Sequence, residues 1–302
     1  MLFLSIVVNG IIHSSTVREV IVMSKIKIVT DSTMDMPLEM AEKLGIVVVP
    51  LSVTINGESY LDRVEIDAAE YITVMKKSEE LPKSSQPSAG TFLEVYDRLG
   101  EEGYEVLSIH MTGKMSGTVR SAESAAQMTK TKVTVIDSMF ISIALQFQVK
   151  EAAEMALQGK SMEEILNRLD RVREHTKLYI MIDTLENMVK GGRIGKGKAF
   201  IGSLLNIKPI ASLEGAEYNP VAKVRSHTQV VKYMAKQFAE DVQGKTIYGA
   251  GIVHAEAYEL SSKLKKAITE LTGYKDISID YTGPTISTHT GPGTIALMYY
   301  FE

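Results

Sequence analysis

Lys25-Ile-Lys-Ile-Val-Thr-Asp-Ser-Thr33 is the stretch that sets the fold, a short run rich in β-branched residues that ends in a polar loop. Residues 26–30 predict a buried strand, because the run is apolar, short and bounded by loop-forming residues. Pro37 follows at the first position of a predicted helix, with Asp35 as its N-cap. A strand that passes through a polar loop into a helix is one unit of an α/β fold.

The same alternation continues to about residue 175. Predicted strands cover 46–54, 106–111 and 132–136. The predicted helices cover 68–77, the segment from Pro87 with its apolar stripe from Phe92 to Leu99, 122–128, the segment ending at Gly159, and 161–175. Asp67 with Glu70 predicts the start of the first of these helices, and Ser161 with Glu164 predicts a capping box for the last. We therefore expect residues 24–175 to form an α/β sandwich with a largely parallel sheet.

The pattern changes after residue 175. Residues 178–182 predict a strand, and residues 207–225 predict a hairpin that turns at Glu214-Gly215. Further on, helices at 227–241 and 256–271 alternate with strands at 246–253 and 277–281. Residues 176–302 are therefore expected to form a smaller, mixed α+β domain. A cleft between two domains is the default place for a binding site.

The first residues pose a separate question, because Met1 begins an apolar run. Polar residues interrupt the run well before the roughly 20 apolar residues that a membrane span needs. No basic segment precedes it, as a signal peptide would require. We expect residues 1–23 to be an extension outside the fold, arising from an added or misassigned start, and no stable insertion into a membrane. A weak membrane-contacting segment is the alternative.

Composition narrows the possible functions. The 302 residues carry 33 Lys and Arg against 37 Asp and Glu, a formal net charge of −4, which does not favour nucleic acid as a partner. The chain has no Cys, so disulfides, thiolate nucleophiles and Cys-ligated metals are excluded. With only six His, no clustered metal site is visible. With 45% hydrophobic residues, the chain can form a sizeable core.

Four polar loops are expected where strands meet helices, which is where α/β sheets place ligands. They are Thr30–Thr33 with Asp31 and Ser32, Ser84–Gly90, Thr112–Thr118 with Ser116, Gly117 and Thr118, and Thr288–Thr294 with His289. The third could bind an anion through amides and hydroxyls at a helix start. Each also has a structural explanation, such as capping a helix or satisfying turn backbone.

Two enzyme classes remain as alternatives. Gly192–Lys198 matches the first seven positions of a phosphate-binding P-loop, but Ala199 replaces the Ser or Thr that binds Mg²⁺. A better interpretation of this segment is a helix–loop–helix that presents Arg193 and two lysines to an acidic surface or a phosphate. The residues around Ser116 also lack the spacing of a hydrolase nucleophile elbow. Because catalytic triads are defined by geometry, sequence leaves a hydrolase possible.

Taken together and in order, five motifs resemble the DegV family of bacterial fatty-acid-binding proteins. They are Val29-Thr-Asp-Ser-Thr-Met-Asp, Ser84-Ser-Gln-Pro-Ser, Met115-Ser-Gly-Thr, Gly191-Gly-Arg-Ile and Thr288-His-Thr-Gly-Pro-Gly. Each motif alone is short, but their joint order covers residues 25–302. The resemblance implies a cytoplasmic protein that holds one long-chain fatty acid, such as palmitate, with its tail in an apolar tunnel of the larger domain.

The resemblance also implies roles for single residues. Ser84, Ser116 and His289 match the positions that bind the carboxylate, and Ser84 stands where Thr is common. Arg193 matches an arginine beside the pocket, and Arg225 matches one that engages a partner fatty acid kinase. That kinase would supply ATP and Mg and phosphorylate the carboxylate, giving an acyl-phosphate for phospholipid synthesis. On this interpretation the chain is a carrier without catalytic residues, metal or cofactor of its own.

Overall fold

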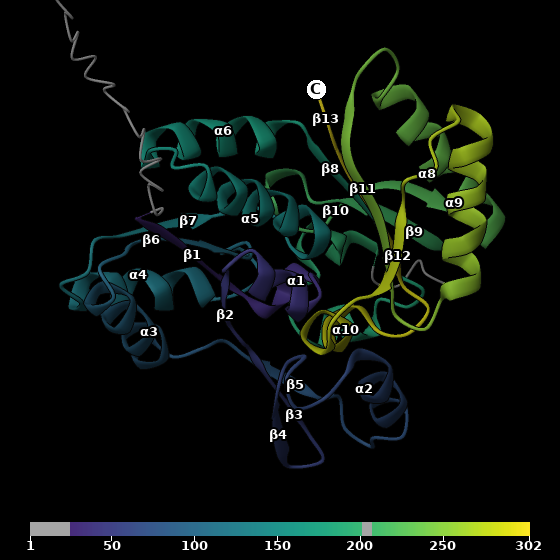
Figure 1. The fold of residues 1–302 in the computed structure, drawn as a ribbon. Coiled ribbons are helices and arrows are strands. Elements are labelled where there is room, and N and C mark those ends of the chain that lie inside the picture. Colours follow the sequence, from purple (N-terminus) through teal and green to yellow (C-terminus); the bar gives the residue numbers. More distant parts are fainter. Residues whose placement is uncertain (1–24, 201–206) are drawn as a thin grey trace, which may run out of the picture.

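The computed structural model describes residues 25–200 and 207–302, whose helices and sheets lie in alternating layers (Figure 1). The expected extension, residues 1–23, lies outside the described residues. Within the described ranges, no helix is both long and apolar enough to cross a membrane. The α/β architecture expected from the sequence is confirmed, with a parallel sheet in the N-terminal part and a mixed sheet in the C-terminal part.

The first sheet has the strand order β2–β1–β6–β7, and every pairing in it is parallel. Its strands are β1 (Ile26–Asp31), β2 (Val47–Val49), β6 (Glu105–His110) and β7 (Val133–Asp137). Val29 in the central strand β1 faces Val47 on one side and Ser108 on the other. The central strands β1 and β6 are buried along most of their length, as expected of a parallel sheet covered on both faces.

Helices cover both faces of this sheet. Phe92, Tyr96 and Leu99 form the expected apolar stripe of α3, which packs with α4 on one face. On the other face lie α5 and α6, and α6 begins with the expected capping box of Ser161 and Glu164. The helices of this part, with one 3₁₀ turn, are η1 (Ser32–Met34), α1 (Leu38–Lys43), α3 (Ala89–Glu101), α4 (Thr118–Met128), α5 (Ser142–Leu157) and α6 (Met162–Glu174).

The second sheet has the order β10–β9–β8–β13–β11–β12 and is mixed, since only β11 and β12 pair in parallel. Its strands are β8 (Thr176–Met181), β9 (Lys208–Ser212), β10 (Asn219–Val224), β11 (Ile247–His254), β12 (Ser278–Tyr281) and β13 (Ile295–Phe301). The associated helices are α7 (Glu186–Lys190), η2 (Gly195–Phe200), η3 (Glu214–Ala216), α8 (His227–Asp241) and α9 (Tyr258–Thr272). The hairpin expected at residues 207–225 is confirmed as β9–η3–β10.

A third, antiparallel sheet corrects one expectation. Residues 46–54 were expected to form one strand, but Pro50 separates β2 from β3 (Ser52–Ile55), which belongs to a different sheet. Proline cannot donate to a strand ladder, so a break at this position is expected on physical grounds. The remaining elements here are β4 (Glu58–Leu61), β5 (Lys83–Ser85), α2 (Ala68–Met75) and α10 (Pro284–Thr290).

Two local expectations are wrong. Asp35 is no N-cap: it is buried with φ 53°, and Pro37 occupies the cap position before α1. Residues 288–290, expected in a loop, form the end of helix α10, with Pro284 in its first turn. The β-branched and hydroxyl residues of α10 have low intrinsic helix propensity, so the sequence does not predict a helix there. Contacts with other elements stabilise this helix instead.

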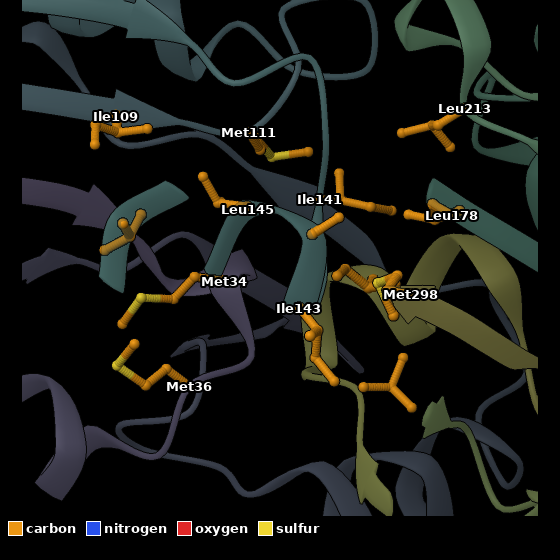
Figure 2. Packing of buried hydrophobic residues seen from close by; sticks show 14 of the residues in the cluster. Met34, Met36, Ile109, Met111, Ile141, Ile143, Leu145, Leu178, Leu213 and Met298 are labelled. Carbon is orange, nitrogen blue, oxygen red and sulfur yellow. The ribbon is translucent and has the colours of Figure 1, made fainter. Parts of the chain in front are cut away.

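Helix α5 joins the two main sheets. It contacts β1 and β6 of the first sheet and β8, β11 and β13 of the second. Figure 2 shows part of the resulting core, in which Ile141, Ile143 and Leu145 of this segment lie among side chains from both sheets. The core therefore continues across residue 175, the boundary that we expected between two domains. That division stays an interpretation.

Candidate functional site

Ser84 and His289 lie in direct contact although 205 residues separate them in the sequence. Ser84 stands in β5, and its Oγ lies 2.7 Å from Nε2 of His289 near the end of α10. The other ring nitrogen, Nδ1, is buried and has no hydrogen-bond partner among the described residues. Two motifs predicted to recognise one carboxylate are thus brought together.

The Gly-Gly-Arg motif packs against the same histidine. A Cβ added to Gly191 would lie 2.3 Å from Nδ1 of His289, so only glycine leaves room for the ring in this position. Arg193 follows, and its Nε donates to the carbonyl oxygen of Met115 at 3.0 Å, while its Nη1 donates to the carbonyl oxygen of Gly191 at 2.6 Å. Arg193 therefore connects the histidine to the segment that carries Ser116.

Ser116 begins the turn into α4. Its Oγ lies 2.8 Å from the hydroxyl of Thr118 and accepts a hydrogen bond of 3.3 Å from the Thr118 amide. Gly117 occupies the N-cap position without a capping side chain. Because a helix start carries partial positive charge, the hydroxyl of Ser116 stands in surroundings that favour an anion.

Gln86 contacts the turn that carries Ser116. Its side-chain amide lies so close to Gly117 that an added Cβ there would meet it at 2.1 Å, and it donates to the hydroxyl of Ser121 at 2.9 Å. Gln86 stands two residues after Ser84. Contacts therefore run from Ser84 to His289, through the Gly-Gly-Arg motif to the Ser116 turn, and back through Gln86. We call this arrangement the head-group circuit.

The electrostatics of His289 follow from this position. Burial, and to a lesser degree the charge of Arg193, lower the pKa of His289 to about 4. The imidazole is therefore neutral at pH 7 and offers one N–H donor and one acceptor. The positive charge nearby comes from Arg193, whereas Ser84 and Ser116 offer hydroxyl donors. Such a set suits a carboxylate better than a cation or a neutral amide.

The first polar loop is engaged with the protein itself. Asp31 accepts hydrogen bonds from Thr33 and from the amide of Met111, and it contacts His110 at 3.1 Å. Ser32 donates to Asp62 at 2.7 Å and accepts from the amide of Leu51. The structure does not bring Asp31 or Ser32 into the head-group circuit by any of these contacts. A direct role in binding stays a prediction for both.

Arg225 lies apart from the circuit, exposed between β10 and α8. Its neighbour in sequence His227 lines a surface pocket of about 630 Å³, together with Asp183 and Tyr258. His227 contacts Asp183 at 2.9 Å, and Lys208 also reaches that carboxylate at 2.5 Å. In the P-loop-like segment, Lys196 lies 3.6 Å from the carboxylate of Glu217, so this lysine is paired within the protein.

Sequence reasoning overlooked Gln86, Gly191 and a pair of buried carboxylates, Asp35 and Asp62. Gln86, Gly191 and Asp35 lie inside the quoted motifs, so their presence there is a usable signal. Asp62 carries no such signal, because neighbours distant in the sequence create its surroundings. In the part of the chain that the structure describes, no group of three His, Asp or Glu side chains could hold a metal ion.

Comparison with known proteins gives the family. A family model described as "uncharacterised protein, DegV family" matches residues 25–302. The chain belongs to the DegV family. A DegV domain-containing protein of Listeria monocytogenes is 43% identical to this DegV chain over 281 residues, covering 93% of this chain and 100% of the relative. One from Staphylococcus aureus is 41% identical over 276 residues, covering 91% and 99%.

Solved structures of DegV proteins share the fold. A DegV family protein from Thermus thermophilus, whose structure is described under "fatty acid binding", superposes with a TM-score of 0.86 and 34% identity, covering 91% of this chain and 99% of that one. DegV of Bacillus subtilis, described as a fatty acid binding protein, gives a TM-score of 0.84 and 32% identity, covering 92% and 100%. The DegV membership expected from the five motifs is confirmed.

Proposed function

We propose that this DegV protein binds one long-chain fatty acid, such as palmitate, and presents its carboxylate in the cytoplasm to a partner ATP-dependent fatty acid kinase. The product would be an acyl-phosphate for phospholipid synthesis. The observation that carries the proposal is the head-group circuit. In it Ser84 contacts His289 directly, and Arg193 reaches the segment of Ser116 through the carbonyl oxygen of Met115. The fatty-acid-binding DegV proteins of Thermus thermophilus and Bacillus subtilis support the class of ligand.

The chemistry of the circuit fits a carboxylate. A buried carboxylate without partners is very costly, so hydroxyl and N–H donors must replace its water. Ser84 and Ser116 can each donate one hydrogen bond, and the unpartnered Nδ1 of His289 is a further polar atom at the site. The positive charge of Arg193 compensates the negative charge of the acid.

An apolar core adjoins the circuit. Met115, the residue before Ser116, packs against the large core cluster, and Met188 and Ile194 on either side of the Gly-Gly-Arg motif belong to it. Methionine side chains such as those of Met34, Met36 and Met111 in Figure 2 are flexible enough to repack around a tail. Each buried methylene of the tail contributes about 0.8 kcal/mol.

The partner kinase would supply ATP, Mg and the phosphoryl-transfer machinery. Arg225 is the proposed contact with this partner, because it is exposed and stands outside the circuit. The pocket beside His227 would belong to the same face. Since an acyl-phosphate reacts with water, enclosing the carboxylate between β5, α4 and α10 would also protect the product.

The Ser84–His289 contact favours one alternative function, a hydrolase that uses Ser84 as its nucleophile. A serine activated by histidine needs a third group that orients the imidazole. Nδ1 of His289 has no partner in the described ranges, so this orienting contact is not formed there. Covalent labelling of Ser84 by a fluorophosphonate would favour the hydrolase; a protein that stays unlabelled agrees with the carrier.

Mass spectrometry tests the carrier function. The protein is purified from bacteria, denatured, and its released lipids are quantified. We expect about one long-chain fatty acid per chain, because a buried tail gives slow release. A matched sample of His289→Ala should carry less. Consistent absence of fatty acid from the wild-type protein would contradict the proposal.

A further inference from the structure

Three residues with strained backbone conformations meet at one buried carboxylate. Asp35, Arg63 and Ser142 have φ values of 53°, 64° and 58°, in the left-handed region that residues other than glycine rarely adopt. Asp35 accepts hydrogen bonds from the other two, at 3.2 Å from Nη1 of Arg63 and at 2.6 Å from Oγ of Ser142. Strain of this kind persists only where the surrounding structure holds it, and it is typical of functional sites.

The same carboxylate fixes the start of the helix that carries the head-group histidine. Asp35 accepts a hydrogen bond of 2.7 Å from the hydroxyl of Thr282 and one of 2.8 Å from the amide of Gly283. Gly283 is the N-cap of α10, and no side chain of α10's own segment caps that position. The first turn of α10 is thus held by a residue that lies 248 positions away in the sequence.

Further contacts hold the rest of α10. The hydroxyl of Tyr71 lies 2.5 Å from that of Thr288, and the side-chain amide of Asn187 donates to the Thr288 carbonyl at 3.0 Å. These contacts fix the end of the helix beside His289, whereas Asp35 fixes its beginning. With only seven residues, α10 has too few internal hydrogen bonds to keep its place unaided.

Ser142 extends the connection to the apolar core. It is the first residue of α5, the helix that lies between the two main sheets and contributes Ile143 and Leu145 to the core. Asp35 therefore joins the helix that carries the head-group histidine to a helix of the core proposed to receive the tail. Both contacts are made by Oδ2 of this carboxylate, which accepts from Ser142 and from Thr282.

We propose that Asp35 is a positioning residue of the head-group site, whose carboxylate holds the first turn of α10 against the start of α5 and so keeps His289 on Ser84. Asp35 does not touch the ligand in this arrangement. The inference rests on the proposed function for its meaning, because a carboxylate is the group that His289 and Ser84 are placed to meet. Its geometry, however, can be tested without any ligand.

The first measurement is the titration of the His289 ring in the ligand-free protein, followed by NMR. In the wild type, the pKa of His289 is lowered to about 4 by its burial. In Asp35→Ala, α10 loses its anchor, and the pKa of His289 should move toward the ordinary value of about 6.5. Thr282→Val, which removes a single hydroxyl contact with little change in volume, should give a smaller shift in the same direction and serves where Asp35→Ala does not fold.

The second measurement separates head-group recognition from tail binding. Affinities are measured for palmitate and for hexadecanol, which has the same tail and no carboxylate. Asp35→Ala should weaken palmitate binding by about tenfold, because a displaced His289 can no longer hydrogen-bond the charged carboxylate of palmitate. Hexadecanol has no such group, so its binding should weaken much less. Tyr299→Phe is the matched control, since it removes a part-buried hydrogen bond of 2.5 Å to Asp241 of α8, within a different apolar cluster from the one that includes Ile143 and Leu145 of α5.

The outcomes are distinct. The proposal fails if the His289 titration stays at its wild-type position in both Asp35→Ala and Thr282→Val, or if palmitate and hexadecanol weaken equally. It also fails if Tyr299→Phe reproduces the effects of Asp35→Ala, because general destabilisation would then explain them. A wild-type protein that binds neither ligand contradicts the proposed function alone, and the ligand-free titration still decides the role of Asp35.

Discussion

At the scale of single residues, the candidate site combines neutral hydrogen-bonding groups with the fixed positive charge of Arg193. His289 is held neutral by burial, while Ser84 contacts its Nε2 and Arg193 lies between the histidine and the Ser116 turn. A carboxylate that enters this surrounding can gain several hydrogen bonds at once. Because bonds to a charged group contribute more than neutral ones, each donor should have a measurable share in affinity.

Ser116→Ala removes the hydroxyl at the start of α4. We expect palmitate affinity to fall by about tenfold, the effect of losing a hydrogen bond to a charged group. Calorimetric titration of delipidated protein measures this loss. Ser124→Ala, the same change on the exposed side of α4, removes only a contact with the carbonyl of Arg120 and should bind as the wild type does. Equal affinity of wild type and Ser116→Ala would exclude Ser116 from head-group binding.

Gly191→Ala tests the packing of the histidine. The added Cβ would stand 2.3 Å from Nδ1 of His289, so the ring must move away from Ser84. Palmitate affinity should drop by about tenfold or more, since a contact to the charged group is lost. Gly90→Ala is the control, because its Cβ meets only ordinary contacts in the first turn of α3. If the two variants bind palmitate equally, the close packing of Gly191 on His289 does not contribute to palmitate binding.

Asp62 predicts a dependence of stability on pH. Burial, above all, raises its pKa from 3.8 to about 6. Between these values the folded state binds more protons than the unfolded state, so this group's contribution to stability falls as pH rises from about 4 to about 6 and is level above. The total change is about 3 kcal/mol. Asp35 and Arg63 face the same carboxyl and are unchanged in the test variant.

Asp62→Asn lacks this titration. The free energy of unfolding of the variant, minus that of the wild type, should grow in the variant's favour by up to about 3 kcal/mol between pH 4 and pH 7. Urea unfolding at a series of pH values measures the difference. A difference that stays constant over this range would show that Asp62 titrates at an ordinary pKa. The comparison isolates Asp62 from other titrating groups, because both proteins share them.

At the scale of helices and strands, local patterns predicted what local chemistry decides. The capping box at Ser161, the N-cap at Asp67 and the stripe from Phe92 to Leu99 depend on neighbours within one helix, and all three are confirmed. Helix α10 could not be predicted in this way. Its residues favour other conformations, and it is held by Asp35 and Tyr71 from distant parts of the chain.

The candidate site shows the same division. The resemblance predicts Ser84, Ser116 and His289 as carboxylate-binding residues, and the structure brings Ser84 and His289 into contact. The first motif includes Asp35 but gives it no role in the site, because that role depends on folding that places Ser142 and Thr282 around one carboxylate. Sequence reveals which residues carry suitable chemistry, whereas the residues that position them become visible only when distant elements meet.

Helix α5 carries the prediction for this scale. Ala144 is fully buried, so Ala144→Leu adds three carbon atoms to a packed core and should lower stability by about 1–3 kcal/mol. We expect weaker binding of palmitate and of hexadecanol alike, because the tail and not the head group is affected. Affinity measurements with both ligands and urea unfolding test this. Lys150→Leu, at an exposed position of α5, is the control; unchanged tail binding in Ala144→Leu would place the tail away from this part of α5.

At the scale of the whole molecule, the two main sheets share one core through α5 (Figure 1). Helices α8 and α9 pack on the outer face of the second sheet through a separate apolar cluster that includes Val230, Phe238 and Leu264. The head-group circuit lies where the third sheet, α4, α7 and α10 come together. Under the proposed function, the carboxylate would be presented at this junction, and other faces would be left for the partner.

Arg225→Ala tests this division of roles. The variant should retain its fatty acid, because Arg225 makes no contact with the head-group circuit in the described structure, but acyl-phosphate formation with a cognate kinase and ATP should fall. Arg98→Ala removes an exposed arginine on α3 and should leave kinase coupling unchanged. Loss of bound lipid in Arg225→Ala, or full coupling to the kinase, would contradict the proposed partner face.

The most direct test is a crystal structure of the protein with palmitate. We predict that the carboxylate lies within hydrogen-bond distance of Oγ of Ser116 and of Ser84 or His289, with the tail running into the core beside Met115. A palmitate bound elsewhere, such as in the pocket beside Asp183 and His227, or a head-group circuit that excludes the carboxylate, would contradict the account.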